Sequence, residues 1–574
     1  MMARVTRPLM LILGLLLVLS GCSAVPASSD PIVIGPAVPG RDQSGGGGLG
    51  IQPGGPEPDA STDQIVRDFI KALTATDTSF AVAREFLTPE SAKEWKPSDQ
   101  VTVIDVAYAA TPGLAEGSVT FTANRVARVD SSGSYRNDNG AVNYEFTLEK
   151  VQGQWRIDNP PDALILDTSS FASLYKDASV YFADPSGTRL VPDVRYFRTN
   201  LEQRANRLVQ ALLDGPISTL EPGVRNELDD PVKLRSAVSY GTEPITIDLS
   251  GLGEKSEAQR RIASAQVVWT LRDLGVTKVM ITNNGEPLKI TGVGDVQSDS
   301  DWAEYDPNAY PVNASAYYLH EGGVHDDSTA KIPGPVGTGE YQITDAAVST
   351  DGSRIATVSG GAAPPVLRTG GVTELLTVVD LPGTTSLSAP TWGPFTEEFW
   401  IARNGTEIVR VSSKGAPKIV GTPALGQLGP IRSIVLSRSG TRLAIIAGEP
   451  DGPGRLYIST VQATADSVAI LQPEPMAADL DVSGVVWSDA RTIALLGRSS
   501  PTGTVFPYTM LVDGSRRLQL PPPALAGESS AIAAAPGRAF LSSISHYVLK
   551  LQDSDWVSLA GGIVVSGTKP FYPG

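Results

Sequence analysis

The hydrophobic positions that follow residue 60 keep a helical period first and an alternating one afterwards. One apolar stripe runs at helical spacing, and Ser61 or Thr62 can cap its start. A second helical piece spans residues 80–86. Helices first and an antiparallel sheet afterwards predict a small α+β domain over residues 61–175. The stripe is Ile65, Phe69, Ile70 and Leu73, and the strand-like runs are residues 101–106, 118–129, 142–151 and 155–157.

Residues 176–300 switch repeatedly between the two periods. Ile245, Ile247 and Leu249 alternate with polar residues, as in a half-buried strand, and Gly215-Pro216 ends the helix before it. This alternation predicts a layered α/β domain whose helices lie against a sheet. The expected order is a strand at 179–182, a helix at 201–212, a strand at 245–250, a helix at 257–274 and a strand at 279–281.

The pattern changes again from residue 301 to residue 574, where helical stripes vanish and short strand runs alternate with turns rich in Gly, Pro and Ser. Similar units recur, with spacings of 43, 45, 50 and 48 residues when they are aligned on Ser349, Trp392, Ser437, Trp487 and Ala535. A period of about 40 to 50 residues with turn-rich β signals is typical of a β-propeller. With an incomplete unit at residues 316–324, we expect five or six blades; one or two β-sandwiches are the alternative.

The N-terminus has the pattern of an export signal. Two cations and no acid precede an apolar run, residues 9–19, that is shorter than the about 20 residues a membrane-spanning helix needs. The run ends in Leu19-Ser20-Gly21-Cys22, which resembles the bacterial lipobox. That resemblance implies cleavage between Gly21 and Cys22, with diacylglycerol on the Cys22 thiol and a palmitoyl group on its new amino group. An ordinary signal peptide with a chance cysteine is the alternative.

The segment after the signal, residues 22–60, is rich in Pro, Gly, Ser and Asp. We interpret it as a flexible tether, and about 38 such residues give a root-mean-square span of roughly 35 Å. Gly45, Gly47 and Gly50 formally match a dinucleotide-binding pattern, but neither a strand before nor a helix after gives it the required context. We therefore expect no cofactor there.

Charge and cysteine content narrow the possible partners. The chain has 46 basic and 62 acidic residues, a formal net charge of −16, so it repels phosphate backbones and nucleic acid is not expected as a partner. For the same reason the membrane link must come from the acyl chains rather than from attraction to anionic lipid. Cys22 is the only cysteine, so the folded parts depend on apolar cores and not on disulfides.

The search for catalytic chemistry finds little. His320 and His325 flank an acidic loop-like stretch, but their spacing matches no usual zinc signature, and we expect solvated loop residues and no metal. Asp351 is expected to serve turn geometry, and Trp392 and Trp487 to pack blades rather than to bind a ligand. No residue is singled out as catalytic.

The lipobox signal, the α+β domain, the α/β domain and the propeller, in this order, resemble one family, the actinobacterial lipoprotein LpqB. The N-terminal matches lie in residues 63–70, 83–89 and 94–95, and the first domain is similar to the cone-like nuclear-transport-factor-2 class. The second domain resembles the GerMN domain in residues 208–216, 247–250 and 266–271. Asp68 departs from the family, which has a small residue there; a helix surface tolerates the change.

The resemblance implies a regulatory role rather than an enzymatic one. LpqB-like proteins are thought to act with the extracytoplasmic part of the sensor kinase MtrB, of the MtrA/MtrB two-component system, and so to modulate cell-wall homeostasis and division. The chain would then be anchored at the outer face of the cell membrane. The alternative is an envelope protein that binds or hydrolyses glycan or peptidoglycan, which needs two carboxylates in a cleft about 5 to 10 Å apart.

Overall fold

The structure is a computed structural model. It describes residues 53–574 except 76, 199–200, 239–240, 242, 361–363, 395–396, 423, 465–466 and 526. Cys22, the cleavage position after Gly21 and most of the expected tether lie outside the described residues. The lipid anchor therefore stays a prediction from the sequence.

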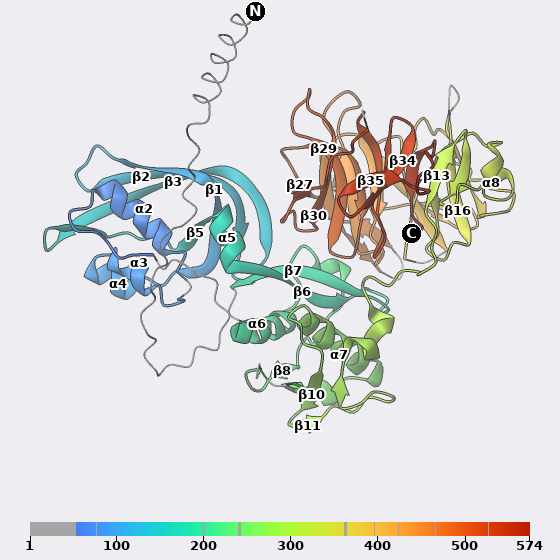
Figure 1. Ribbon diagram of the computed structural model, residues 1–574. Coiled ribbons are helices and arrows are strands. Elements are labelled where there is room, and N and C mark those ends of the chain that lie inside the picture. The colour runs from blue at the N-terminus through green and yellow to red at the C-terminus, as the bar shows by residue number, and fades with distance from the viewer. Residues whose placement is uncertain are drawn as a thin grey trace, which may run out of the picture. The chain divides into compact units, whose positions relative to one another are not determined.

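The N-terminal domain is a curled five-stranded sheet with helices preceding it in the chain (Figure 1). Its strand order is β4-β3-β2-β1-β5; the β1–β5 pair is parallel and the other pairs are antiparallel. Helix α2 packs on the sheet through Ile65 and Phe69, both buried, which confirms the predicted stripe. Ser61 occupies the N-cap position of α2 without a side-chain cap bond, whereas Thr88 accepts from the Ser91 amide and caps α4. The elements are α2 Thr62–Ala72, α3 Ala81–Glu85, α4 Pro89–Glu94, β1 Ser98–Pro112, β2 Ser118–Val129, β3 Tyr135–Val151, β4 Gln154–Ile157, β5 Ala163–Asp167 and α5 Thr168–Leu174.

The second domain contains a feature that the sequence patterns did not predict. The strand expected at residues 179–182 is the first arm of a long antiparallel hairpin, β6–β7, which forms a two-stranded sheet of its own. It therefore does not join the sheet of β9 and β10, as the simple alternation of strands and helices suggested. The elements are β6 Tyr175–Ala183, β7 Leu190–Arg198, α6 Leu201–Asp214, η1 Glu221–Gly223, β8 Lys233–Leu234, β9 Ile245–Ser250, η2 Leu252–Glu254, α7 Glu257–Arg272, β10 Val279–Asn283, β11 Glu286–Pro287, β12 Val296–Gln297 and η3 Asp299–Tyr305.

Helix α7 is the centre of this domain. A capping box between Ser256 and Gln259 fixes its start, and all ten residues from Ile262 to Leu271 are buried. The sequence predicted one buried face, but α6, β6 and η3 pack around the helix and cover the others. Polar residues of α7 are consequently buried as well.

The C-terminal domain is a β-propeller with six blades within the described residues, in agreement with the expected five or six (Figure 1). The first blade has the order β14-β13-β36, so the last strand of the chain becomes its innermost strand and closes the ring. The strands are β13 Tyr317–His320, β14 Gly323–Asp326, β15 Ile343–Val348, β16 Arg354–Ser359, β17 Val366–Gly371, β18 Thr377–Val378, β19 Thr391–Trp392, β20 Glu398–Arg403, β21 Glu407–Ser412, β22 Pro417–Ile419, β23 Ile431–Leu436, β24 Arg442–Ala447, β25 Arg455–Ala463, β26 Val468–Ile470, β27 Glu474–Met476, β28 Asp481–Trp487, β29 Thr492–Arg498, β30 Phe506–Leu511, β31 Leu518–Gln519, β32 Ser529–Ala533, β33 Leu541–Ile544, β34 Tyr547–Gln552, β35 Asp555–Ser558 and β36 Thr568–Phe571.

In the blades that begin with β15, β19, β23, β28 and β32, the repeating turn joins the two innermost strands, as predicted. The amides of Ser349, Ser437 and Ser488 each donate to a carbonyl four or five residues further on, at 2.8–3.0 Å. Gly352 and Gly440 supply the positive φ that these turns need. Ser488 is therefore the structural equivalent of Ser349. The repeats had been aligned on Trp487, so that alignment is displaced by one residue in this unit.

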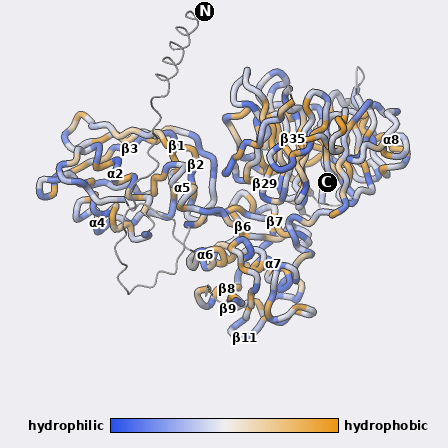
Figure 2. Tube along the Cα trace, viewed as in Figure 1, coloured by the Kyte–Doolittle hydropathy of each residue, from blue (hydrophilic) through white to orange (hydrophobic). Residues whose placement is uncertain are grey.

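Hydrophobic positions are interleaved with polar ones throughout the propeller, as Figure 2 shows. The inner strands β24 and β29 are instead mostly apolar and buried on both faces, as blades stacked face to face require, since each inner strand contributes side chains to two neighbouring interfaces. No helix in the described part of the chain is long and apolar enough to cross a membrane.

Candidate functional site

The residues singled out from the sequence have structural roles where the structure describes them. Trp392 and Trp487 are buried, and their Nε1 atoms donate to the Ala347 and Val435 carbonyls of the preceding blade at 2.9 and 3.1 Å. These bonds join adjacent blades, which confirms the packing role. Asp351 accepts from the hydroxyl of Ser349 and from the amide and hydroxyl of Ser353, which confirms its turn role.

The expectation for the histidines was wrong in one respect. His320 and His325 lie on the paired strands β13 and β14 rather than in a solvated loop, and their ring centroids are 5.4 Å apart. His325 is buried beside Tyr318, and burial lowers the pKa of its imidazole. Within the described residues, no group of three or more His, Cys, Asp or Glu side chains could hold a metal ion.

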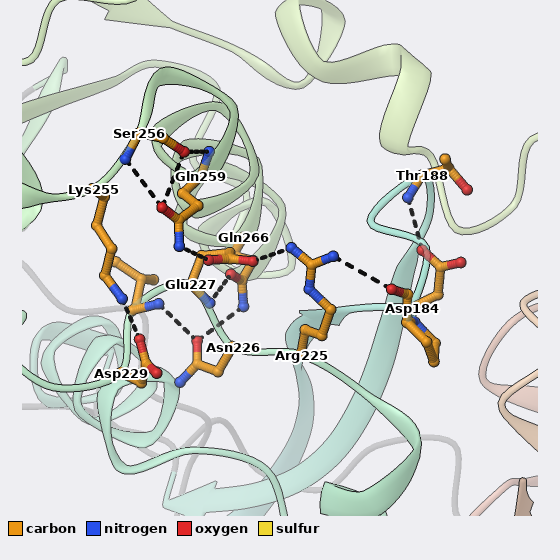
Figure 3. Close-up of polar contacts among 12 residues, drawn as sticks. Asp184, Thr188, Arg225, Asn226, Glu227, Asp229, Lys255, Ser256, Gln259 and Gln266 are labelled. Carbon is orange, nitrogen blue, oxygen red and sulfur yellow. Dashed lines mark hydrogen bonds and ion pairs between the residues drawn. The ribbon is translucent and has the colours of Figure 1, made fainter. Parts of the chain in front are cut away.

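A buried polar network in the second domain fastens the loop before β8 to helix α7 (Figure 3). Gln266 is fully buried; its carbonyl accepts from the Glu227 amide at 3.0 Å, and its amide donates to Tyr181 O and Asn226 Oδ1 at 3.0 and 3.1 Å. The Glu227 carboxylate accepts from Gln259 Nε2 at 3.0 Å and from Arg225. Because each of these carboxylate and amide groups is hydrogen-bonded, the network stabilises the fold and leaves no reactive group free.

The β6–β7 hairpin is the second polar centre, and its residues contact all three domains. Asp193 and Arg195 form an ion pair at 2.7 Å with side chains only 1% and 3% exposed. Arg195 also donates to the Ser132 carbonyl of the N-terminal domain at 2.9 Å, and Asp193 accepts from the Ile217 amide at 3.0 Å. Tyr196 continues the contact with the N-terminal domain, since its amide donates to the Gly133 carbonyl at 2.7 Å.

The opposite contacts of the hairpin reach the propeller. Arg442 of β24 donates to the Pro192 carbonyl at 2.7 Å, and the Tyr196 hydroxyl donates to Ser515 Oγ at 2.7 Å. The carboxylate of Asp177, 7% exposed, pairs with Arg491 and Arg516 of two propeller turns. A single hairpin therefore connects the propeller to the two domains that precede it.

Buried charge is concentrated at this junction. Asp193, Arg442 and Asp513 line a cavity of about 90 Å³. Asp193 Oδ1 and Asp513 Oδ2 are closed off from solvent and have no hydrogen-bond partner among the described residues. Burial raises the pKa of Asp513 to about 6 and lowers the pKa of Arg442 to about 10. Burial of these charged groups is electrostatically unfavourable, but their hydrogen bonds and ion pairs define where the hairpin contacts the propeller.

This junction brings together groups that no sequence motif marked. Asp193, Arg195, Arg442 and Asp513 are ordinary charged residues in strands and turns, and only their tertiary partners distinguish them. The Ser515 hydroxyl donates to Asp513 Oδ1 at 2.5 Å and accepts from the Tyr196 hydroxyl at 2.7 Å, so it takes part in the contact between the hairpin and the propeller. Its groups bind one another and hold domains together.

Three family models match successive parts of the chain. They are described as the N-terminal domain of lipoprotein LpqB at residues 55–172, sporulation and spore germination at 179–289, and the β-propeller domain of lipoprotein LpqB at 320–573. A lipoprotein LpqB of Rhodococcus opacus is 30% identical over 95% of this chain and 93% of that protein. The chain belongs to the LpqB lipoprotein family.

A second relative agrees with this membership. A lipoprotein LpqB of Mycolicibacterium smegmatis is 30% identical over 98% of this chain and 99% of that protein. The tandem GerMN domains of the sporulation protein GerM from Bacillus subtilis align with 26% of this chain and 58% of that one, at 20% identity and a TM-score of 0.20. The family and its order of domains are those that the sequence motifs resembled.

Proposed function

We propose that this LpqB-family protein is a non-enzymatic accessory lipoprotein that modulates a sensor kinase of the MtrB type. It is anchored through Cys22 at the outer face of the cell membrane and binds the extracytoplasmic part of the kinase. Through that contact it adjusts signalling linked to cell-wall homeostasis and division. The observation that carries the proposal is membership of the LpqB family over nearly the whole chain, with all three domains present.

The polar centres of the structure support the non-enzymatic part of this proposal. The charged groups of Asp177, Asp193, Arg442 and Glu227 are engaged in contacts within or between domains. Such groups give a platform of fixed shape, which suits recognition of another protein's ectodomain. A tether between anchor and first domain would let that platform reach its partner.

The proposal is tested by copurification and by kinase output in the same strain. The full chain, isolated from membranes with mild detergent, is expected to retain the MtrB-type kinase, and deletion of its gene is expected to change phosphorylation of the cognate response regulator. A strain in which an ordinary cleavable export signal replaces residues 1–22 separates the anchor from the fold: it should make a folded protein that is released from the membrane and does not restore output. Unchanged phosphorylation in the deletion strain would refute the proposal.

A further inference from the structure

The propeller encloses a cavity on its axis. The innermost strands of the six blades described above, β36, β15, β19, β23, β28 and β32, surround about 250 Å³ of space. Side chains from several blades that face this space are small, so they do not fill it as the side chains of a packed core would. They include Ala346, Ala389, Ser433, Gly484 and Ala531.

One end of the channel is occupied by the chain itself. Arg438 and the Tyr310 hydroxyl donate to the Pro573 carbonyl at 3.0 and 3.2 Å, and the Gly574 amide donates to the Val348 carbonyl at 2.8 Å. The Arg438 guanidinium also lies 4.4 Å from the centre of the Tyr310 ring. The last two residues of the sequence are therefore held at this end of the channel through their backbone groups.

The other end, where the innermost strands begin, is polar and accessible. Lys569 Nζ lies 2.6 Å from Asp345 Oδ1 and 2.9 Å from the Thr344 carbonyl, with the Lys569 and Asp345 side chains 52% and 21% exposed. Ser433 and Ser483 also line the channel, and neither hydroxyl has a hydrogen-bond partner in the described chain. We call the end formed by Asp345, Ser433, Ser483, Ser530 and Lys569 the channel mouth.

The backbone at the mouth is irregular in the same place in four blades. A one-residue register shift separates the innermost strand from its neighbour at Thr344, Arg432, Ser483 and Ser530. A bulged residue is left out of the strand ladder, so its N–H and C=O groups become available to other partners. The mouth thus presents a ring of backbone and hydroxyl groups together with one cation and one carboxylate.

We propose that the channel mouth binds the end of an extended polypeptide segment from another protein. Backbone donors and acceptors of such a segment match the bulges and the Ser433 and Ser483 hydroxyls, and the positive charge of its free N-terminus matches the Asp345 carboxylate. The volume lies below the roughly 300–1,000 Å³ of small-molecule sites, so the cavity takes a chain end rather than a whole compact ligand.

A sugar fits this mouth less well than a peptide does. Saccharide sites present an aromatic face, but Trp487 is buried and its indole is bonded to the preceding blade, and Phe571 is stacked on Tyr317 at 5.5 Å. The proposal does not depend on the kinase being the partner. Failure of the kinase experiment above leaves the channel site standing, and failure of the peptide experiment below leaves the kinase proposal standing.

The test uses the full chain and a random heptapeptide library displayed on phage with free N-termini. Recovered peptides are resynthesised with free and acetylated N-termini, and their affinity is measured by fluorescence anisotropy. Ser483→Trp places a bulky side chain in the mouth and is expected to weaken binding at least tenfold. The matched control is Thr377→Trp, on the exposed outermost strand β18, which is expected to change affinity less than twofold.

A second measurement needs no variant and covers the case in which Ser483→Trp does not fold. A bound peptide should slow amide hydrogen exchange in β28 and β32 of the unmodified chain and leave β18 unchanged. Asp345→Asn should weaken peptides with a free N-terminus more than it weakens their acetylated forms. A selection that enriches no sequence above an unrelated protein, equal binding by the parent and folded Ser483→Trp, or displacement of peptide by soluble cell-wall glycan would each overturn the proposal.

Discussion

The charge on Asp513 makes the stability of this protein depend on pH in a direction that can be stated in advance. Its Oδ1 accepts from the amide and hydroxyl of Ser515, whereas Oδ2 is sealed from solvent without a partner. Burial is the largest cause of its raised pKa, and the nearby Asp177 raises the pKa further, while Ser515 and Arg491 oppose the rise. The change to make is Asp513→Asn, which keeps the shape and removes the ionisation.

The magnitude follows from the pKa. The value rises from the usual 3.8 to about 6, and at about 1.36 kcal/mol for each pH unit this corresponds to at most about 3 kcal/mol. The folded chain binds more protons than the unfolded chain between about pH 4 and pH 6, so the free energy of unfolding falls as the pH rises through this window and then levels off. Asp513→Asn should therefore have a higher free energy of unfolding than the parent at pH 7. This difference between variant and parent should be about 1 kcal/mol smaller at pH 5.

Urea unfolding monitored by tryptophan fluorescence, from pH 5 to pH 8 at constant ionic strength, measures this difference. These conditions stay above the isoelectric point of about 4.8. The matched control is Asp351→Asn, because Asp351 begins the same Asp-Gly-Ser-Arg turn but is exposed. If the pH profile of Asp513→Asn ran parallel to that of the parent, the reasoning about the buried carboxylate would be refuted.

Three further predictions concern the contacts that hold blades and domains together. Asp177→Asn removes the carboxylate that pairs with Arg516 and leaves Arg491 paired with Asp273 alone; because Arg516 is 54% exposed, the cost should be about 1 to 3 kcal/mol, below that of a fully buried pair, seen as a lower urea midpoint at pH 7; an unchanged midpoint would contradict the junction described here. Trp487→Phe removes the hydrogen bond to the Val435 carbonyl and part of the packing, and should lower the free energy of unfolding by about 1 to 3 kcal/mol in the same assay. Thr377→Ala, at an exposed residue, is the control, and an equal loss there would contradict a specific role of Trp487. Gly440→Ala, at φ +72°, should lower the thermal midpoint, while Gly426→Ala, at a residue with open space around it, should change it much less.

The periodic parts of the fold followed from the sequence because burial there depends on local spacing. The α2 stripe, the strands at 118–129 and 245–250, and the turns that join β15 to β16, β23 to β24 and β28 to β29 are all as predicted. Trp392 and Trp487 were assigned to blade packing because each precedes the turn of a repeating β-unit. His325 was misassigned because its surroundings look polar in sequence but form paired strands in space.

The sequence by itself predicted the domain types, the family and an export and lipidation signal, because each prediction depends on short-range pattern: a lipobox, alternating or helical periods, and a repeat of 40 to 50 residues. Only the tertiary structure decided that β6 pairs with β7 outside the main sheet and that Asp193, Arg195, Arg442 and Asp513 meet. It also decided that six innermost strands leave a cavity between them. These features arise from contacts between residues up to several hundred positions apart, and the free energy of such contacts leaves no trace in local periodicity.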